Sequence, residues 1–135
     1  TIYGYKGKQV RDNIHSHDLI RAFDAFHGNP RQGEAYNIGA GNEVPNIRVA
    51  ETICDLLGKP RSLITPVPDR LGHDLRYALD CAKLRTLGWE PRAAFDEALA
   101  ATVRWYAEHE DWWRKIKDRS REFRSFYSTY YKDRT

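Results

Sequence analysis

The sequence predicts an α/β protein, on three observations. Short extended stretches alternate with amphipathic helices along the chain, which is the order expected of strand and helix units. The extended stretches are too few to close a sheet that stands alone, so we expect one part of a larger α/β architecture. The 135 residues suffice for one domain with a modest core.

The N-terminal part is expected to be extended first and then helical. Residues 1–5 and 9–15 have strand-like composition on either side of a turn at Gly7. Ser16 is a favourable N-cap for a helix that residues 28–30 end. One face of this helix is apolar and carries Leu19, Ala22, Phe23 and Phe26.

The middle of the chain is expected to hold two strands with a helix between them. Residues 35–39 have the composition of a brief strand, and residues 40–43 that of a turn. Asn46 is a favoured N-cap for the next helix, which ends near Gly58. Residues 63–67 are expected to form a strand at an edge or an end, because prolines flank it.

The C-terminal part is expected to be helical. A short helix over residues 81–87 ends at Gly88, and a long helix begins near Asp96 and Glu97, whose charges suit its positive end. The inner face of the long helix would carry Phe95, Ala98, Leu99, Thr102, Val103, Tyr106 and Trp113. Residues 119–131 mix aromatic and charged side chains, which predicts a further helix packed on a partner or on another part of the protein.

The composition argues against several classes of protein. The net charge is +3 and basic residues are interleaved with acidic ones, so a nucleic-acid partner is not required. No run is long and apolar enough to span a membrane and no signal peptide is evident, so a cytoplasmic protein without a membrane partner is expected. Cys54 and Cys81 have no metal-ligand spacing and are expected to be small buried thiols.

The stretch from Pro68 to Asp80 concentrates ionisable groups around one glycine. Arg70 and Arg76 are candidate diphosphate ligands, because a guanidinium presents a rigid fork that suits phosphate oxygens. Arg11 lies in an extended stretch, and its side chain could complete a clamp of three arginines. Surface ion pairs or a solvated strand residue explain these arginines about as well.

Two further positions have weaker cases as ligands. Asn46 lies where a helix begins, and a helix N-terminus favours an anion, although the N-cap role explains it as well. Tyr3 is an aromatic side chain that could stack on a ring.

Two other patterns favour structural explanations. Residues 39–41, G-A-G, lack the third glycine of a dinucleotide fingerprint, so a plain turn is expected. His15 and His17 have no third ligand at a sensible spacing, so no metal site is expected, and a strand-to-helix junction explains them together with Ser16.

Several motifs occur in an order that resembles one enzyme family. They lie at residues 7–15, 36–39, 45–46, 69–80, 83–84 and 87–89. In this order they resemble extended short-chain dehydrogenase/reductases of the NAD-dependent nucleotide-sugar epimerase/dehydratase family. The central D-R-x-G-H-D-x-R-Y-A-x-D is most similar to dTDP-glucose 4,6-dehydratases, whereas residues 5–16 resemble CDP-sugar epimerase-like members. Such dehydratases usually carry Trp where Asn13 stands, so a dehydratase and an epimerase both stay open.

The resemblance implies that residues 1–135 are a small mixed α/β C-terminal domain that binds a nucleotide-diphosphate sugar and completes a Rossmann-type enzyme. By analogy, Arg11 and Arg70 would contact the diphosphate. Tyr3 and Asn46 would line the nucleotide pocket, and His73 would lie beside the phosphate or the base.

The resemblance also implies an N-terminal Rossmann domain that binds NAD(P) and lies outside this chain. The chain has no methionine and begins inside strand-like sequence, so we expect the C-terminal piece of a longer protein. No tyrosine is followed four residues later by lysine, so the family's catalytic pair is not in this sequence. We therefore expect no catalytic, cofactor-binding or metal-binding residue here, no catalysis by this part alone, and a homodimeric parent enzyme.

Two other classes of function stay as alternatives. A stand-alone binding or interaction module would dock its aromatic C-terminal helix on a partner. A small nucleic-acid-binding domain would need a basic face and would show steep salt dependence of binding, and the interleaved charges argue against it.

Overall fold

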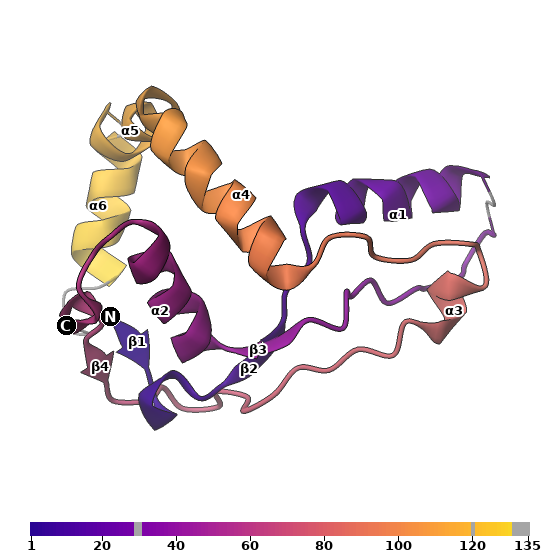
Figure 1. The fold of residues 1–135 in the computed structure, drawn as a ribbon, viewed down its shortest axis with the longest axis horizontal. Coiled ribbons are helices and arrows are strands. Elements are labelled where there is room, and N and C mark those ends of the chain that lie inside the picture. The colour runs from indigo at the N-terminus through magenta and orange to yellow at the C-terminus, as the bar shows by residue number, and fades with distance from the viewer. Residues whose placement is uncertain (29–30, 120, 131–135) are drawn as a thin grey trace.

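The structure is a computed structural model that describes residues 1–28, 31–119 and 121–130 (Figure 1). Its strands are β1 (Ile2–Tyr3), β2 (Val10–Asp12), β3 (Glu43–Pro45) and β4 (Pro66–Val67). Its α-helices are α1 (Ser16–Gly28), α2 (Asn46–Leu56), α3 (Ala82–Arg85), α4 (Phe95–Glu108), α5 (Glu110–Arg119) and α6 (Arg121–Tyr130), and 3₁₀ turns lie at Tyr5–Gly7 and Arg61–Leu63. The mixed α/β class predicted from the sequence is confirmed.

The molecule is elongated, with α1 and α3 at one end and β1, β4, α2 and α6 at the other (Figure 1). β1 pairs with β4 in parallel, and β2 pairs with β3 antiparallel. On the other edge of β2, Val10 bridges to Arg76: the Val10 N–H donates to the Leu75 oxygen at 2.8 Å, and the Val10 oxygen accepts from the Tyr77 N–H at 3.1 Å. β2 therefore ties the 68–77 loop to β3.

The strands are shorter than the sequence predicts. Residues 35–39 are extended, but no described strand lies beside them to complete a ladder, so the predicted strand is not formed. β4 covers only two residues, because Leu63 belongs to a 3₁₀ turn and Pro66 cannot donate to a ladder. Beyond the bridge at Arg76, residues 77–80 form no strand either.

The two predicted N-caps are each wrong by one residue. Leu19 N–H donates to the His15 oxygen at 3.1 Å and His17 N–H donates to His15 Nδ1 at 3.3 Å, so His15 rather than Ser16 caps α1. Pro45 holds the cap position of α2 without a side-chain hydrogen bond. Asn46 is the first helical residue, and its N–H donates to the Gln9 oxygen at 2.9 Å.

The predicted long C-terminal helix is broken in the structure. α4 ends at Glu108, and His109 leaves helical geometry with φ −114° and ψ 43°. The His109 ring stacks on Trp105 with a centroid distance of 4.5 Å. Trp113 was predicted to lie on the same helix, but it belongs to α5 and reaches back with its indole N–H to the Tyr106 oxygen at 3.0 Å. The predicted final helix is present as α6, and residue 131 lies outside the described residues.

A small core lies where α1 meets α3. Ala22, Leu84 and Trp89 are buried, and Trp89 donates its indole N–H to the Asp18 oxygen at 3.0 Å. Cys81 is buried beside this core, whereas Cys54 is half-buried in α2. Within the described ranges, no helix is long and apolar enough to cross a membrane.

The buried carboxylate of Asp18 fastens α1 to the connector before α4. It accepts hydrogen bonds from Arg92 N–H at 3.1 Å, from Ala93 N–H at 2.9 Å and from the Arg21 guanidinium at 2.5 Å. Burial by itself raises the pKa of Asp18, but these donors outweigh it and hold the pKa below its usual value. The sequence did not reveal this role of Asp18, because its main-chain donors are 74 and 75 positions away.

Candidate functional site

The five site residues predicted from the sequence lie on segments that the strand pairing joins. Tyr3 ends β1, Arg11 is the central residue of β2, and Asn46 follows β3 directly. Arg70 and His73 lie on the loop that leaves β4 and returns to Val10 through the bridge at Arg76. Backbone pairing thus connects the segments that carry the five residues, which span 71 positions of sequence.

Arg11 is half-buried, and nearby main-chain and aromatic groups hold its side chain. One terminal nitrogen donates to the Asp74 oxygen at 2.9 Å, and the other donates to the Val10 oxygen at 2.7 Å. The guanidinium lies 4.3 Å from the centroid of the Tyr77 ring. These contacts fix the side chain in place while it keeps its full positive charge, since all its partners are neutral.

Arg11 and Arg76 line one surface concavity of about 330 Å³, together with Asp12, Tyr77, Ala78 and Leu79. Arg76 is already paired with the Glu43 carboxylate at 2.6 and 3.0 Å, and this hydrogen bond lowers the pKa of Glu43. Arg70 is exposed and is not among the residues that line this concavity. The structure thus brings Arg11 and Arg76 to one concavity, whereas Arg70, on the same loop as Arg76, lies outside it.

His73 belongs to a cluster that the sequence did not reveal. Its Nδ1 lies 2.6 Å from Asp69 Oδ1, and the hydrogen bond lowers the pKa of Asp69. Gln9 is fully buried beside this pair, with its Nε2 3.1 Å from His73 Nδ1 and 3.5 Å from Asp69 Oδ2. A buried glutamine in an extended stretch has no sequence signature, because its partners are 60 and 64 positions away.

Gly4 lets the Asp69 carboxylate approach the backbone. A Cβ atom at this glycine would lie 1.9 Å from Asp69 Cγ, and Gly4 also has a positive φ of 40°. No side chain fits between this glycine and the carboxylate. The close approach to Gly4 helps to fix the position of Asp69. Because Asp69 is hydrogen-bonded to His73, it also helps to fix the His73 ring.

The G-A-G turn at residues 39–41 does not fit a dinucleotide. Asp12 accepts from the N–H groups of Gly41 at 3.1 Å and Asn42 at 2.9 Å, so an anionic side chain already occupies the donors that a pyrophosphate would need. The turn interpretation from the sequence agrees with these contacts. The described residues therefore offer no fit for NAD at this loop.

The histidine pair at the start of α1 has a structural explanation. The rings of His15 and His17 meet edge to face at 4.8 Å, and Nδ1 of His15 is used in capping. In the described parts of the chain, no group of three His, Cys, Asp or Glu side chains is placed to hold a metal ion.

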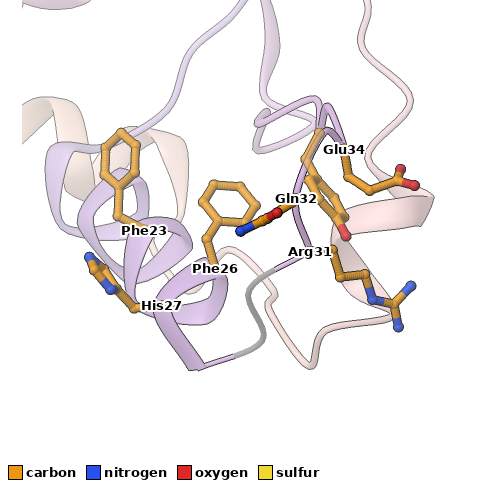
Figure 2. A pocket seen from close by; sticks show the side chains of 7 residues that line it. Phe23, Phe26, His27, Arg31, Gln32 and Glu34 are labelled. Atoms are coloured by element: carbon orange, nitrogen blue, oxygen red, sulfur yellow. The ribbon is translucent and has the colours of Figure 1, made fainter.

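A second hollow lies at the far end of α1, away from these residues (Figure 2). It encloses about 600 Å³ and is lined by Phe23, Phe26, His27, Arg31, Gln32, Glu34 and Tyr36. Phe23 is 53% exposed, although it belongs to the apolar face that the sequence predicts for this helix. The Tyr36 hydroxyl is buried without a hydrogen-bond partner among the described residues. An apolar hollow of this kind usually contacts another protein surface.

Comparison with known proteins identifies similar sequences and structures. A family model described as GDP-mannose 4,6 dehydratase matches residues 1–102. A dTDP-glucose 4,6-dehydratase of Streptomyces niveus is 42% identical over 117 residues, which are 86% of this chain and 34% of the relative. The resemblance found in the motifs is confirmed by these matches.

Two solved structures are similar in fold as well as in sequence. The dTDP-glucose 4,6-dehydratase of Bacillus anthracis, in complex with NAD, is 43% identical with a TM-score of 0.76, over 84% of this chain and 36% of that one. The epimerase Mth375 of Methanothermobacter thermautotrophicus is 32% identical with a TM-score of 0.75, over 84% of this chain and 34% of that one. The chain spans about a third of the length of the curated relatives it matches.

Proposed function

The chain belongs to the GDP-mannose 4,6-dehydratase family, and from this membership we propose that it is the nucleotide-sugar-binding portion of an NAD-dependent epimerase/dehydratase. The reaction we propose for the whole protein is that of a nucleoside-diphosphate-glucose 4,6-dehydratase. The ligand of the described residues is then the nucleotide diphosphate of the sugar substrate.

The observation that carries this proposal is the hydrogen-bonded junction between β2 and the 68–77 loop. There the Arg11 guanidinium donates to two main-chain oxygens, and the Val10–Arg76 bridge joins β2 to the loop that carries Arg70 and His73. Asn46 follows β3, the partner strand of β2. In our proposal Arg11 and Arg70 bind the diphosphate, because guanidinium groups pair with phosphate oxygens in charge-assisted hydrogen bonds. Tyr3 and Asn46 line the nucleotide pocket, and His73 lies beside the phosphate or the base.

These residues bind and orient the substrate. Holding the sugar in one geometry lowers the entropic part of the barrier, so this portion contributes to rate without moving a proton. The hydride chemistry of NAD would be supplied from a site outside the described residues, because the loop at residues 39–41 does not fit a dinucleotide. We assign no catalytic, cofactor-binding or metal-binding residue within residues 1–135.

We further propose that an N-terminal Rossmann domain of the same protein covers the hollow on α1. The exposed Phe23 and the partnerless Tyr36 hydroxyl support a surface that is buried in the whole protein. The match covers only 34% of the Streptomyces niveus relative, so that protein has the length that such a domain needs. The parent enzyme would be a cytoplasmic homodimer.

Epimerisation of a CDP- or UDP-sugar is the second candidate reaction. It is favoured by Asn13, which stands where such dehydratases usually carry Trp, and by the likeness to an epimerase at a TM-score of 0.75. A stand-alone interaction module is the alternative of another class. It is favoured by the aromatic surface of α5 and α6, where Trp112 and Phe126 are exposed.

One experiment separates these candidates. The whole protein, as its gene encodes it, is incubated with dTDP-glucose and with UDP- and CDP-hexoses, and the products are identified by NMR. A dehydratase gives a 4-keto-6-deoxy sugar nucleotide, and an epimerase gives an isomer of unchanged mass. Intact substrates in every reaction would contradict the enzymatic proposals and favour the interaction module.

A further inference from the structure

We propose that Gln9 is a positioning residue for nucleotide binding, whose buried side chain orients the Asp69–His73 pair and whose main chain holds Asn46. This inference rests on the proposed function and deepens it, because His73 and Asn46 are two of the residues proposed to face the nucleotide. Gln9 itself lies fully buried and does not contact the ligand.

Packing alone does not explain a glutamine at this place. Its side-chain amide is withdrawn from water, which costs free energy unless each polar atom finds a partner. Nε2 has Asp69 Oδ2 as an acceptor and lies next to His73 Nδ1, but Oε1 has no hydrogen bond among the described residues. A methionine or leucine would fill the same space without an unpaired carbonyl, so the amide is explained by what its nitrogen holds.

The protons of the cluster can be assigned from the distances. Asp69 Oδ1 lies 2.6 Å from His73 Nδ1, and an ionised carboxylate only accepts, so Nδ1 carries the proton. Gln9 Nε2 at 3.1 Å then has no lone pair to meet on Nδ1 and donates to Asp69 Oδ2 instead. Gln9 thus donates to Oδ2 of Asp69, and Oδ1 of the same carboxylate accepts the hydrogen bond from the His73 ring.

This arrangement leaves His73 Nε2 for the ligand. The structure shows no hydrogen bond to that nitrogen from any described residue. With Nδ1–H held by Asp69, the orientation of the ring is fixed and Nε2 is left to face the ligand. Without the hydrogen bond to Asp69, the neutral His73 ring can carry its proton on either nitrogen and can rotate.

The main chain of Gln9 fixes the second residue. Its carbonyl accepts the N–H of Asn46 at 2.9 Å, at the first position of α2, and Val10 next to it bonds to Leu75 and Tyr77. A side-chain substitution leaves these main-chain bonds in place. The two contributions of Gln9 can therefore be separated by experiment.

The test uses Gln9→Met, which keeps the volume and removes the amide. Long-range ¹H–¹⁵N NMR of the histidine-labelled whole protein, with the His73 signal assigned through His73→Gln, reports which ring nitrogen carries the proton. In the unsubstituted protein we expect the Nδ1–H form. In Gln9→Met we expect a mixture of both forms and binding of the nucleoside diphosphate about 3- to 10-fold weaker by calorimetry, the loss of one hydrogen bond.

A control separates this role from stability. Leu84→Ala opens a cavity in the α1–α3 core, so it should lower stability without moving the proton on His73. Gln9→Asn, whose shorter amide cannot reach both partners, serves if Gln9→Met does not fold. An unchanged His73 proton and an unchanged affinity in a folded Gln9 variant would overturn the inference. If the unsubstituted protein binds no nucleoside diphosphate, the proposed function fails, while the His73 signal still decides whether Gln9 positions the ring.

Discussion

Arg76 and Glu43 form a two-pronged ion pair, with the arginine Nε and a terminal nitrogen 2.6 and 3.0 Å from the two carboxylate oxygens. The pair neutralises Arg76 at the rim of the concavity that it shares with Arg11. Arg11 instead donates only to main-chain oxygens, so its charge is not cancelled. The two arginines should therefore differ in what they offer an anionic ligand.

Arg11→Gln is expected to weaken binding of a nucleoside diphosphate about 10- to 100-fold, since a charge-assisted contact is lost. Arg76→Gln should have a smaller effect, because its charge is already used by Glu43. Arg48→Gln, which breaks an exposed ion pair with Asp96, is the matched control and should leave affinity unchanged. Isothermal titration calorimetry measures all three variants. Equal affinities for the Arg11 and Arg48 variants would refute the role of Arg11.

Asp18→Asn is expected to lower the free energy of unfolding by about 2–4 kcal/mol, because three donors lose an anionic acceptor that is buried with them. Urea denaturation measures the change. Asp24→Asn, on an exposed position of the same helix, should change stability by less than about 0.5 kcal/mol. A small effect at Asp18 would mean that the hydrogen bonds to the connector contribute little.

The same carboxylate predicts a pH dependence of stability. The pKa of Asp18 is lower in the folded protein than its usual value, so its stabilisation is fully present above the unfolded-state pKa. It is lost as the pH falls through the folded-state pKa. Denaturation measured from pH 7 down to pH 2 should show a steeper acid loss in the unsubstituted protein than in Asp18→Asn. Parallel curves for the two proteins would contradict the assignment.

Gly4→Ala is expected to destabilise the protein by about 1–3 kcal/mol and to displace Asp69 from His73, because the new Cβ meets the carboxylate and the backbone has positive φ. Gly33→Ala is the matched control, since Gly33 also has positive φ (78°) but no atom within 4 Å of a Cβ placed there. Thermal unfolding compares the two variants. The difference between them isolates the cost of the close approach, and equal losses would show that the clash is relieved elsewhere.

The sequence revealed the helices better than the strands. Apolar periodicity located α1 and α2 closely, because an amphipathic helix is specified by residues near in sequence. Residues 35–39 formed no strand, since a strand needs a neighbour and none lies beside it in the described part of the chain. The break at His109 was missed for a different reason: no Gly or Pro marks it, and the ring stack on Trp105 accompanies it.

The sequence also indicated some residues of the candidate site and missed others. Arg11, Arg70 and His73 were predicted as ligands because their residue types suit a diphosphate and because the motif resembles a known family, and that role stays a prediction. Gln9 and Asp69 were missed as a unit, since their importance comes from contacts across 60 positions of sequence. A residue that binds can be recognised by its chemistry, whereas a residue that positions another is recognised only in the fold.

Calorimetric titration of the whole protein with dTDP, UDP, GDP and CDP tests the central claim most directly. The account predicts that one of these nucleotides binds, that the preferred base identifies the substrate, and that Arg11→Gln weakens this binding while Arg48→Gln does not. Absence of binding by all four nucleotides to protein whose fold is verified by circular dichroism would contradict the claim that this chain binds a nucleotide sugar.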